Sequence, residues 1–81
     1  MTIRILVFAS LAEQIGTHHL SLEVGDQAAV ADVLDVLAEQ FPDIASMRGR
    51  LAVAVNHRYA AENHRLSAGD ELALIPPVSG G

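Results

Sequence analysis

The residues best suited to chemistry are the last six, Pro76 to Gly81, which read Pro-Pro-Val-Ser-Gly-Gly. Gly81 would present a free α-carboxylate, the only reactive group that is unique to a chain end. Glycines have no side chains, so this carboxylate can enter a narrow active site on another protein. Pro76 and Pro77 restrict φ and give the segment a direction, and the four residues beyond them span at most about 14 Å. We predict a reactive tail made of Val78, Ser79, Gly80 and Gly81, with simple terminal fraying as the alternative.

Elsewhere the chain lacks the patterns of a catalytic or metal site. It has no cysteine, which excludes a thiol nucleophile and a disulfide. His18 and His19 are adjacent and would point to opposite faces of a strand, so they cannot bind one metal together. The acids Asp32, Asp35 and Glu39 have the spacing of the solvent face of a helix, and no phosphate-binding loop is present. We expect no metal and no bound cofactor.

Length, charge and hydropathy restrict the class of protein. The 81 residues make one domain, and the net charge of −5 argues against nucleic acid as a partner. The start of the chain is not a signal peptide, and no apolar run approaches the about 20 residues of a membrane span. We therefore expect a cytoplasmic protein with no membrane association.

The first third of the chain predicts two strands around a short helix. Ile3 to Ala9 is short, apolar and β-branched, as in a central strand. Ser10 is expected to cap a helix from Leu11 to Ile15, which Gly16 ends. His19 to Val24 alternates strictly between polar and apolar residues, which indicates a half-buried strand.

The longest predicted helix runs from about Ala29 to Gln40. Its apolar residues recur at helical spacing and form one face. They are Val30, Val33, Leu34, Leu37 and Phe41. Pro42 should end this helix, because the residue before a proline avoids the helical region. Ile44 to Arg50 is expected to be irregular or a single turn.

The last third predicts strands separated by turns. Leu51 to Asn56 should be a strand, with Asn56-His57 turning the chain into Arg58 to Ala61. Ser67 to Asp70 is a strong turn signal, and Glu71 to Ile75 is the last strand. The order of elements predicts an α+β domain with a mixed sheet of four to five strands and one main helix.

Several short segments resemble the small subunit of molybdopterin synthase, the MoaD family of ubiquitin-like sulfur carriers. The resembling segments are Phe8-Ala9, Ala54-Val55-Asn56, Gly69-Asp70-Glu71-Leu72 and the tail Pro-Pro-Val-Ser-Gly-Gly. The tail is the most specific of them. Ile75 departs from the pattern, since relatives often carry phenylalanine there. The resemblance implies a ubiquitin-like β-grasp roll over residues 1–77 and a flexible reactive tail over residues 78–81.

The same resemblance implies the chemistry of Gly81. A separate activating enzyme would use ATP to form an acyl-adenylate on its carboxylate, and a sulfur donor would then replace AMP to leave a thiocarboxylate. In the large subunit of the synthase, this sulfur would attack cyclic pyranopterin monophosphate and build the molybdopterin dithiolene. The chain would be one subunit of a sulfurtransferase and would catalyse nothing on its own. The resemblance implies a heterotetramer in which two small subunits lie at the ends of a large-subunit dimer.

The resemblance also implies an apolar surface that docks on the activating enzyme and the large subunit. Its expected residues are Phe8, Tyr59, Ile75, Pro76 and Pro77. Scattered core or surface positions are the alternative for these residues. Arg48, Arg50 and Arg58 either meet acidic groups on a partner or form a solvated face, which is the commoner case.

Other readings of the function stay open at this point. A related carrier would deliver sulfur to the thiazole of thiamine or to another acceptor, although such relatives usually lack the proline pair. A ubiquitin-like modifier would form amide bonds with other proteins. A plain interaction domain would have an inert tail.

Overall fold

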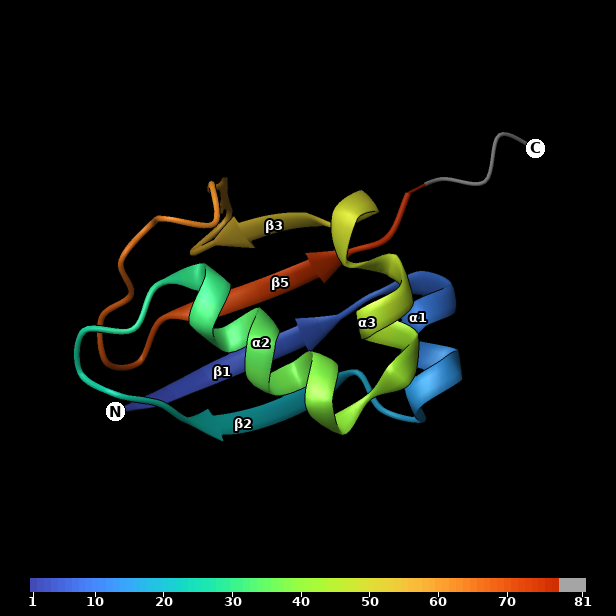
Figure 1. Ribbon diagram of the computed structural model, residues 1–81, viewed down its shortest axis with the longest axis horizontal. Helices are drawn as coiled ribbons and strands as arrows, with labels where there is room; N and C mark the ends of the chain where they lie inside the picture. Colours follow the sequence, from blue (N-terminus) through green and yellow to red (C-terminus); the bar gives the residue numbers. More distant parts are fainter. Residues whose placement is uncertain (78–81) are drawn as a thin grey trace.

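The computed structural model describes residues 1–77, which form a five-stranded mixed sheet with helices against one face (Figure 1). The strands lie in the order β2-β1-β5-β3-β4. Their bounds are β1 (Thr2–Val7), β2 (His19–Glu23), β3 (Ala52–Val55), β4 (Arg58–Tyr59) and β5 (Glu71–Ile75). Only β1 and β5 pair in parallel, and every other pairing is antiparallel. This arrangement is the predicted β-grasp roll.

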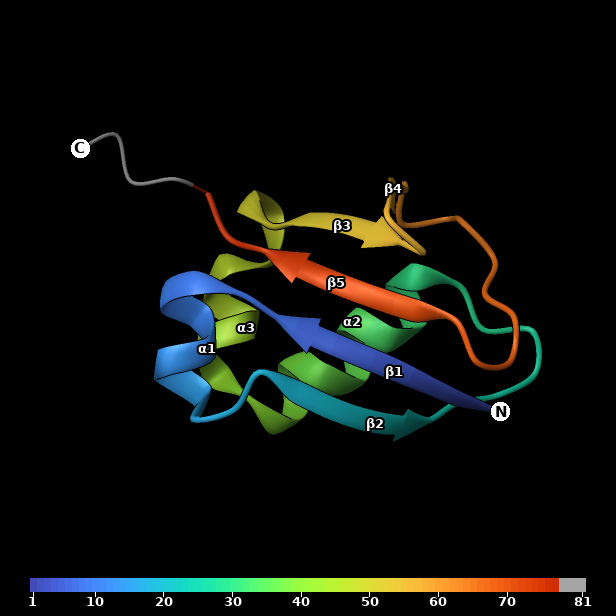
Figure 2. The same cartoon turned by 180° about the vertical axis from the view of Figure 1, so that it is seen from behind.

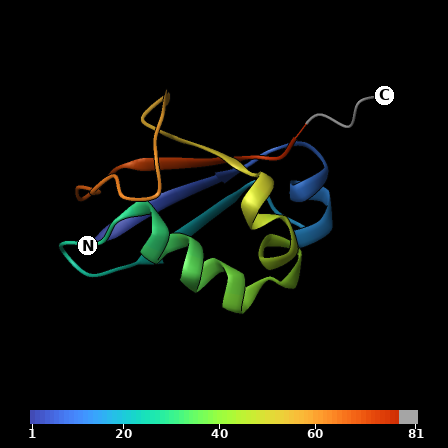
Figure 3. The same cartoon turned by 45° about the horizontal axis from the view of Figure 1, so that its top comes forward.

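The main helix, α2 (Val30–Gln40), crosses one face of the sheet and closes the core (Figure 3). Its predicted apolar face is confirmed, since Val30, Val33, Leu34 and Leu37 are all buried. They pack with the inward side chains of β1 and β5, which are Ile3, Ile5, Val7, Leu72 and Leu74. The helix ends at Gln40, as Pro42 predicts. None of the helices within residues 1–77 is long and apolar enough to cross a bilayer.

The short helix α1 (Ala9–Ile15) begins earlier than predicted and is capped differently. Phe8 occupies the N-cap position without a side-chain hydrogen bond, and Ser10 lies inside the helix, so the predicted Ser10 cap is wrong. Ala9 has φ 53°, which turns the chain out of β1 and makes it a helical residue instead of the end of the strand. The predicted end of the helix is confirmed, because Gly16 adopts the left-handed conformation at φ 83°.

A second correction concerns the segment after Pro42. It forms helix α3 (Pro42–Met47) and the single 3₁₀ turn η1 (Arg48–Arg50), where the sequence predicted irregular chain or one turn. Pro42 stands at the first helical position, where its missing N–H costs nothing. Ile44 is fully buried and anchors α3 on the core. Six residues are too few to repeat an apolar face over two full turns, which is why the pattern did not reveal this helix.

The turns of the second half agree with the sequence. Asn56 and His57 both have positive φ, 51° and 72°, as a tight hairpin turn between β3 and β4 requires. β4 is shorter than predicted and ends at Tyr59. In the turn before β5, Gly69 has φ 82° and the Asp70 carboxylate accepts a hydrogen bond from the Ser67 N–H at 2.7 Å.

Candidate functional site

The face of the sheet opposite α2 is not covered by helices (Figure 2) and carries a shallow hollow of about 270 Å³. We call it the sheet hollow. It is lined by Leu6, Phe8, Ala54, His57, Tyr59, Glu71, Ala73 and Ile75. Side chains alternate along a strand, so the residues between the inward side chains of β1 and β5 point to this outer face. Ala54 and Ala73 pair there, and their small side chains leave the hollow between larger neighbours.

Three predicted interface residues meet at the sheet hollow. Phe8 comes from the junction of β1 and α1, Tyr59 from β4, and Ile75 from the end of β5. Phe8 is 45% exposed and Tyr59 is 80% exposed, and they are the large apolar side chains that residues 1–77 leave most open. Exposed apolar side chains gathered at a concavity are typical of a surface that binds another protein.

The proline pair lies directly after the sheet hollow. Pro76 is buried and Pro77 is exposed, so only Pro77 offers its side chain to a partner. Because Ile75 lines the hollow, the chain leaves the sheet at the border of this surface. The predicted tail residues Val78, Ser79, Gly80 and the reactive Gly81 lie outside the described residues.

A charged group that the sequence did not single out forms the polar wall of the hollow. Glu71 is only 17% exposed and lies opposite Arg4 in the parallel register of β1 and β5. Its carboxylate contacts Arg4 Nη2 at 3.3 Å and His57 Nε2 at 3.7 Å. The alternation of β5 places Glu71 on the outer face, but its two partners come from distant parts of the chain. The wall is therefore polar, held by the ion pair between Glu71 and Arg4, and borders an apolar floor.

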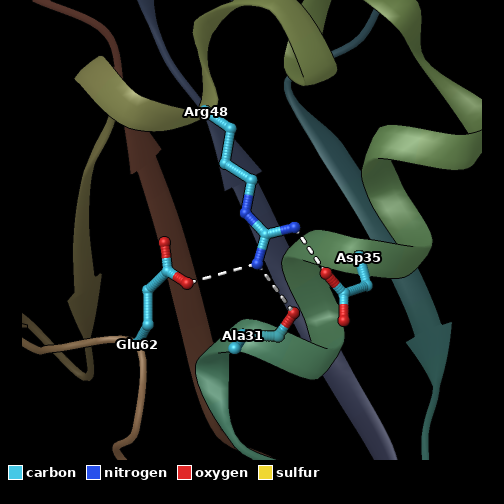
Figure 4. Close-up of polar contacts among 4 residues, drawn as sticks. All are labelled: Ala31, Asp35, Arg48 and Glu62. Carbon is cyan, nitrogen blue, oxygen red and sulfur yellow. Dashed lines mark hydrogen bonds and ion pairs between the residues drawn. The ribbon is translucent and has the colours of Figure 1, made fainter.

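Arg48 makes three polar contacts within its own chain (Figure 4). Its guanidinium donates to the Asp35 carboxylate, to Glu62 Oε1 at 3.2 Å and to the Ala31 carbonyl oxygen at 3.3 Å. The hydrogen bond to Asp35, aided by the one to Glu62, raises the pKa of Arg48 despite some desolvation. Arg48 therefore contacts acidic groups of its own chain, and the prediction that it meets a partner stays a prediction. Arg50 and Arg58 are exposed.

Residues 1–77 contain no group of three or more histidine, aspartate or glutamate side chains placed to hold a metal ion. His57 has one carboxylate near it, that of Glu71. The described part of the chain thus presents an exposed apolar hollow with one polar wall.

Comparison with known proteins gives consistent matches along the chain. The ThiS family matches residues 5–81. The molybdopterin synthase sulfur carrier subunit of Chlamydomonas reinhardtii is 35% identical over 83 residues, covering all of both chains. Small archaeal modifier protein 1 of Haloferax volcanii is 39% identical over 83 residues, covering 93% of this chain and 95% of its own. The crystal structure of that modifier superimposes over the full length of both chains with a TM-score of 0.87.

Proposed function

Because this chain belongs to the ThiS/MoaD family of ubiquitin-like sulfur carriers, we propose that it is the sulfur carrier subunit of a molybdopterin synthase. The observation that carries the proposal is its full-length similarity to molybdopterin synthase sulfur carrier subunits, at 35% identity in one case. The geometry supports it, since an exposed apolar hollow lies where the chain leaves the sheet. Residues 1–77 would be the docking body and residues 78–81 the reactive tail, in the cytoplasm.

The proposed reaction begins at the carboxylate of Gly81, taken as the C-terminus of the mature chain. A carboxylate resists attack because it is negatively charged and has no good leaving group. In the activating enzyme, one carboxylate oxygen attacks the α-phosphorus of ATP, and pyrophosphate leaves. A sulfide-level sulfur from a donor protein then attacks the acyl carbon, and AMP departs with the electrons of the C–O bond. The product is a thiocarboxylate, with no change of oxidation state at carbon.

The second half of the reaction belongs to the large subunit. Sulfur is larger and more polarizable than oxygen, so the thiocarboxylate is the stronger nucleophile. It attacks a carbon of cyclic pyranopterin monophosphate that bears an oxygen, and the new C–S bond replaces that C–O bond as the oxygen departs. Water then cleaves the acyl C–S bond, which leaves the sulfur on the pterin and returns Gly81 as a carboxylate. Two loaded carriers are needed for each dithiolene. The carrier binds no cofactor itself, and ATP is consumed in the activating enzyme.

We assign docking to the sheet hollow. Phe8, Tyr59 and Ile75 would contact both the activating enzyme and the large subunit, with Pro77 at the border. Because one surface would serve both partners, the two complexes would exclude each other. The carrier must then leave the activating enzyme before it can deliver sulfur.

A second candidate is a ubiquitin-like protein modifier. It is favoured by the 39% identity and the TM-score of 0.87 with small archaeal modifier protein 1. Both functions begin with the same adenylate on Gly81. They differ in the final acceptor, which is a pterin in one case and an amine on a protein in the other. A carrier for thiazole or another sulfur acceptor would also share the first step.

The first test is an intact mass of the chain after incubation with ATP, the activating enzyme and a sulfur donor. We expect an increase equal to the difference between one sulfur and one oxygen atom. A chain that lacks Gly81 serves as the control and should not change. An unchanged mass, with an activating enzyme shown to act on another carrier, would reject the carrier chemistry.

The second test identifies the acceptor. The loaded chain is mixed with the large subunit and cyclic pyranopterin monophosphate, and dithiolene formation is followed by its conversion to a fluorescent oxidation product. Molybdopterin formation supports the proposal. A loaded chain that forms no molybdopterin, but appears in covalent conjugates of higher mass in cells, would support the modifier instead.

A further inference from the structure

β2 forms one border of the sheet (Figures 1 and 2), and half of its backbone groups point away from the fold. Met1 and Val24 are a hydrogen-bonded pair: the Val24 N–H donates to Met1 O at 2.9 Å, and the N-terminal ammonium donates to Val24 O at 2.7 Å. In an antiparallel ladder, hydrogen-bonded pairs alternate with pairs that are not hydrogen-bonded. Every second residue before Val24 therefore turns its backbone N–H and C=O away from β1. These residues are Glu23, Ser21 and His19.

The outward groups of β2 are mostly free. The Thr17 hydroxyl accepts from the His19 N–H at 3.2 Å and donates to the His19 carbonyl oxygen at 2.9 Å. The N–H and C=O of Ser21 and Glu23 have no hydrogen-bond partner among residues 1–77. β2 also has no proline or lysine, the residues that commonly block the edge of a sheet. The opposite border, β4, has two residues and is too short to pair well.

We infer that β2 pairs antiparallel with β2 of a second copy of this chain, about a twofold axis at Ser21. In this register Ser21 lies opposite its own counterpart, and the five residues of each β2 are matched in full. His19 of each copy lies opposite Glu23 of the other. The two sheets would become one continuous sheet of ten strands.

Charge complementarity supports this partner. On the outer face, each His19 imidazole faces a Glu23 carboxylate and can donate a hydrogen bond to it, and the symmetry produces this pair twice. Both side chains are exposed in the single chain. The Glu23 carboxylate already accepts from the Thr2 hydroxyl and lies 3.9 Å from the N-terminal ammonium, so on pairing it would be shared with His19 of the second copy. A shift of the register by two residues would place Ser21 opposite His19 or Glu23 and would lose both pairs. The sequence of β2 is therefore self-complementary in one register.

The inner face of the strand supports the same register. Leu20 and Leu22 are only partly buried at the border of the core. Across the proposed axis, Leu20 of one copy lies opposite Leu22 of the other, and each covers apolar surface that water reaches in the single chain. On pairing, the backbone N–H and C=O of His19 would exchange their hydrogen bonds to the Thr17 hydroxyl for bonds to the second copy.

The inferred dimer leaves the docking surface open. The sheet hollow is lined by residues of β1, β3, β4 and β5 and their turns, and none of its lining residues belongs to β2. Two copies joined through β2 would therefore present two free hollows. The inference rests on the backbone of β2 and does not depend on the proposed function.

Sedimentation of the full chain tests the inference. We would measure the mass from about 10 μM to about 1 mM, the range of weak association, near physiological salt so that the net charge of −5 on each copy is screened. The apparent mass should rise from 8.6 kDa toward twice that value. Ser21→Pro removes an outward N–H and no bond to β1, so it should fold and stay monomeric. A monomer at every concentration, or an undiminished dimer of Ser21→Pro, would overturn the inference.

A charge exchange tests the register. His19→Glu and Glu23→His each place like side chains opposite each other twice, and each should weaken the dimer about tenfold. The double variant His19→Glu/Glu23→His restores two complementary pairs and should regain the original association. Circular dichroism checks that all three fold. Failure of the double variant to recover, with its fold intact, would contradict this register.

Disulfide formation gives a direct readout, because the chain has no cysteine of its own. Ser21→Cys places the only two thiols of a dimer opposite each other, within the Cα separation that a disulfide spans. Ser46→Cys, an exposed serine on α3, is the matched control. We expect rapid covalent dimer formation by Ser21→Cys alone under mild oxidation. Equal rates for both variants would count against pairing through β2.

Discussion

At the scale of single residues, Arg48 shows how one side chain can connect three segments. It links α2, through Asp35 and the Ala31 carbonyl, to the loop that carries Glu62. Its side chain is 28% exposed, while both carboxylates are more than half exposed. Solvent therefore weakens the ion pairs, and the partly buried hydrogen bond to the Ala31 carbonyl oxygen is the least exposed of the three contacts.

We predict that Arg48→Met lowers the free energy of unfolding by about 1–2 kcal/mol, since it removes three hydrogen bonds and keeps most of the apolar stem. Urea unfolding followed by circular dichroism measures the change. Arg50→Met is the control, because Arg50 is exposed and two residues away, and it should stay within about 0.5 kcal/mol of the parent. Equal effects of the two substitutions would show that Arg48 does not have this role.

His57 is a residue held in a conformation that favours glycine. Its φ is 72°, and its side chain is 89% exposed with only a 3.7 Å contact to Glu71. We predict that His57→Gly stabilises the fold by about 0.5–1 kcal/mol, after allowing for the added freedom of the unfolded chain. Arg58→Gly, one residue later in β4, should instead destabilise it. Thermal unfolding of both variants tests the opposite signs, and a loss of stability in both would contradict the argument.

At the scale of elements, α3 depends on a tertiary contact more than on its sequence. Six residues make a helix too short to be stable alone, and Ile44 is its one fully buried side chain. We predict that Ile44→Ala costs about 2–5 kcal/mol and reduces the helical signal. Ser46→Ala on the exposed side of α3 should have little effect. If Ile44→Ala behaved like Ser46→Ala in urea unfolding, α3 would not be anchored as described.

The pattern of the sequence predicted α2, β2 and β5 well and the helices at the sheet end poorly. α2 repeats apolar residues over three turns, and β5 alternates over five residues, so periodicity alone reveals both. The predicted cap of α1 was wrong because Ser10 looked like a capping residue, while the helix begins at Ala9, which has a positive φ, and Phe8 is its N-cap. An alanine at positive φ cannot be recognised from the sequence, because alanine is not a residue that favours this conformation.

At the scale of the whole molecule, the sheet hollow is the surface that we propose binds the partner proteins. We predict that Phe8→Ala and Tyr59→Ala each weaken binding to the activating enzyme about tenfold, because exposed aromatic side chains often dominate an interface. Isothermal titration calorimetry measures the affinity. Both residues are substantially exposed, so stability should change little. Gln40→Ala, on the other side of the molecule, is the control. Equal affinity of all three variants would show that the sheet hollow does not bind the activating enzyme.

The tail can be tested separately from the fold. The described sheet and core are complete at Pro77, so deletion of Gly81 should leave unfolding unchanged while it abolishes formation of the thiocarboxylate. Urea unfolding and intact mass together measure the two effects. A deleted chain that unfolds more easily would show that Gly81 also stabilises the fold.

The sequence by itself determined the class of fold, the main helix, the last strand and the candidate reactive tail, because periodicity and backbone restriction are local properties. It also indicated Phe8, Tyr59 and Ile75, through resemblance. Only the tertiary structure showed that these three line one hollow, that Glu71 is held between Arg4 and His57, and that Arg48 binds its own chain. Each of these contacts joins residues far apart in the chain. The register of the strands brings Glu71 beside Arg4, whereas the position of η1 beside α2 brings Arg48 to its partners.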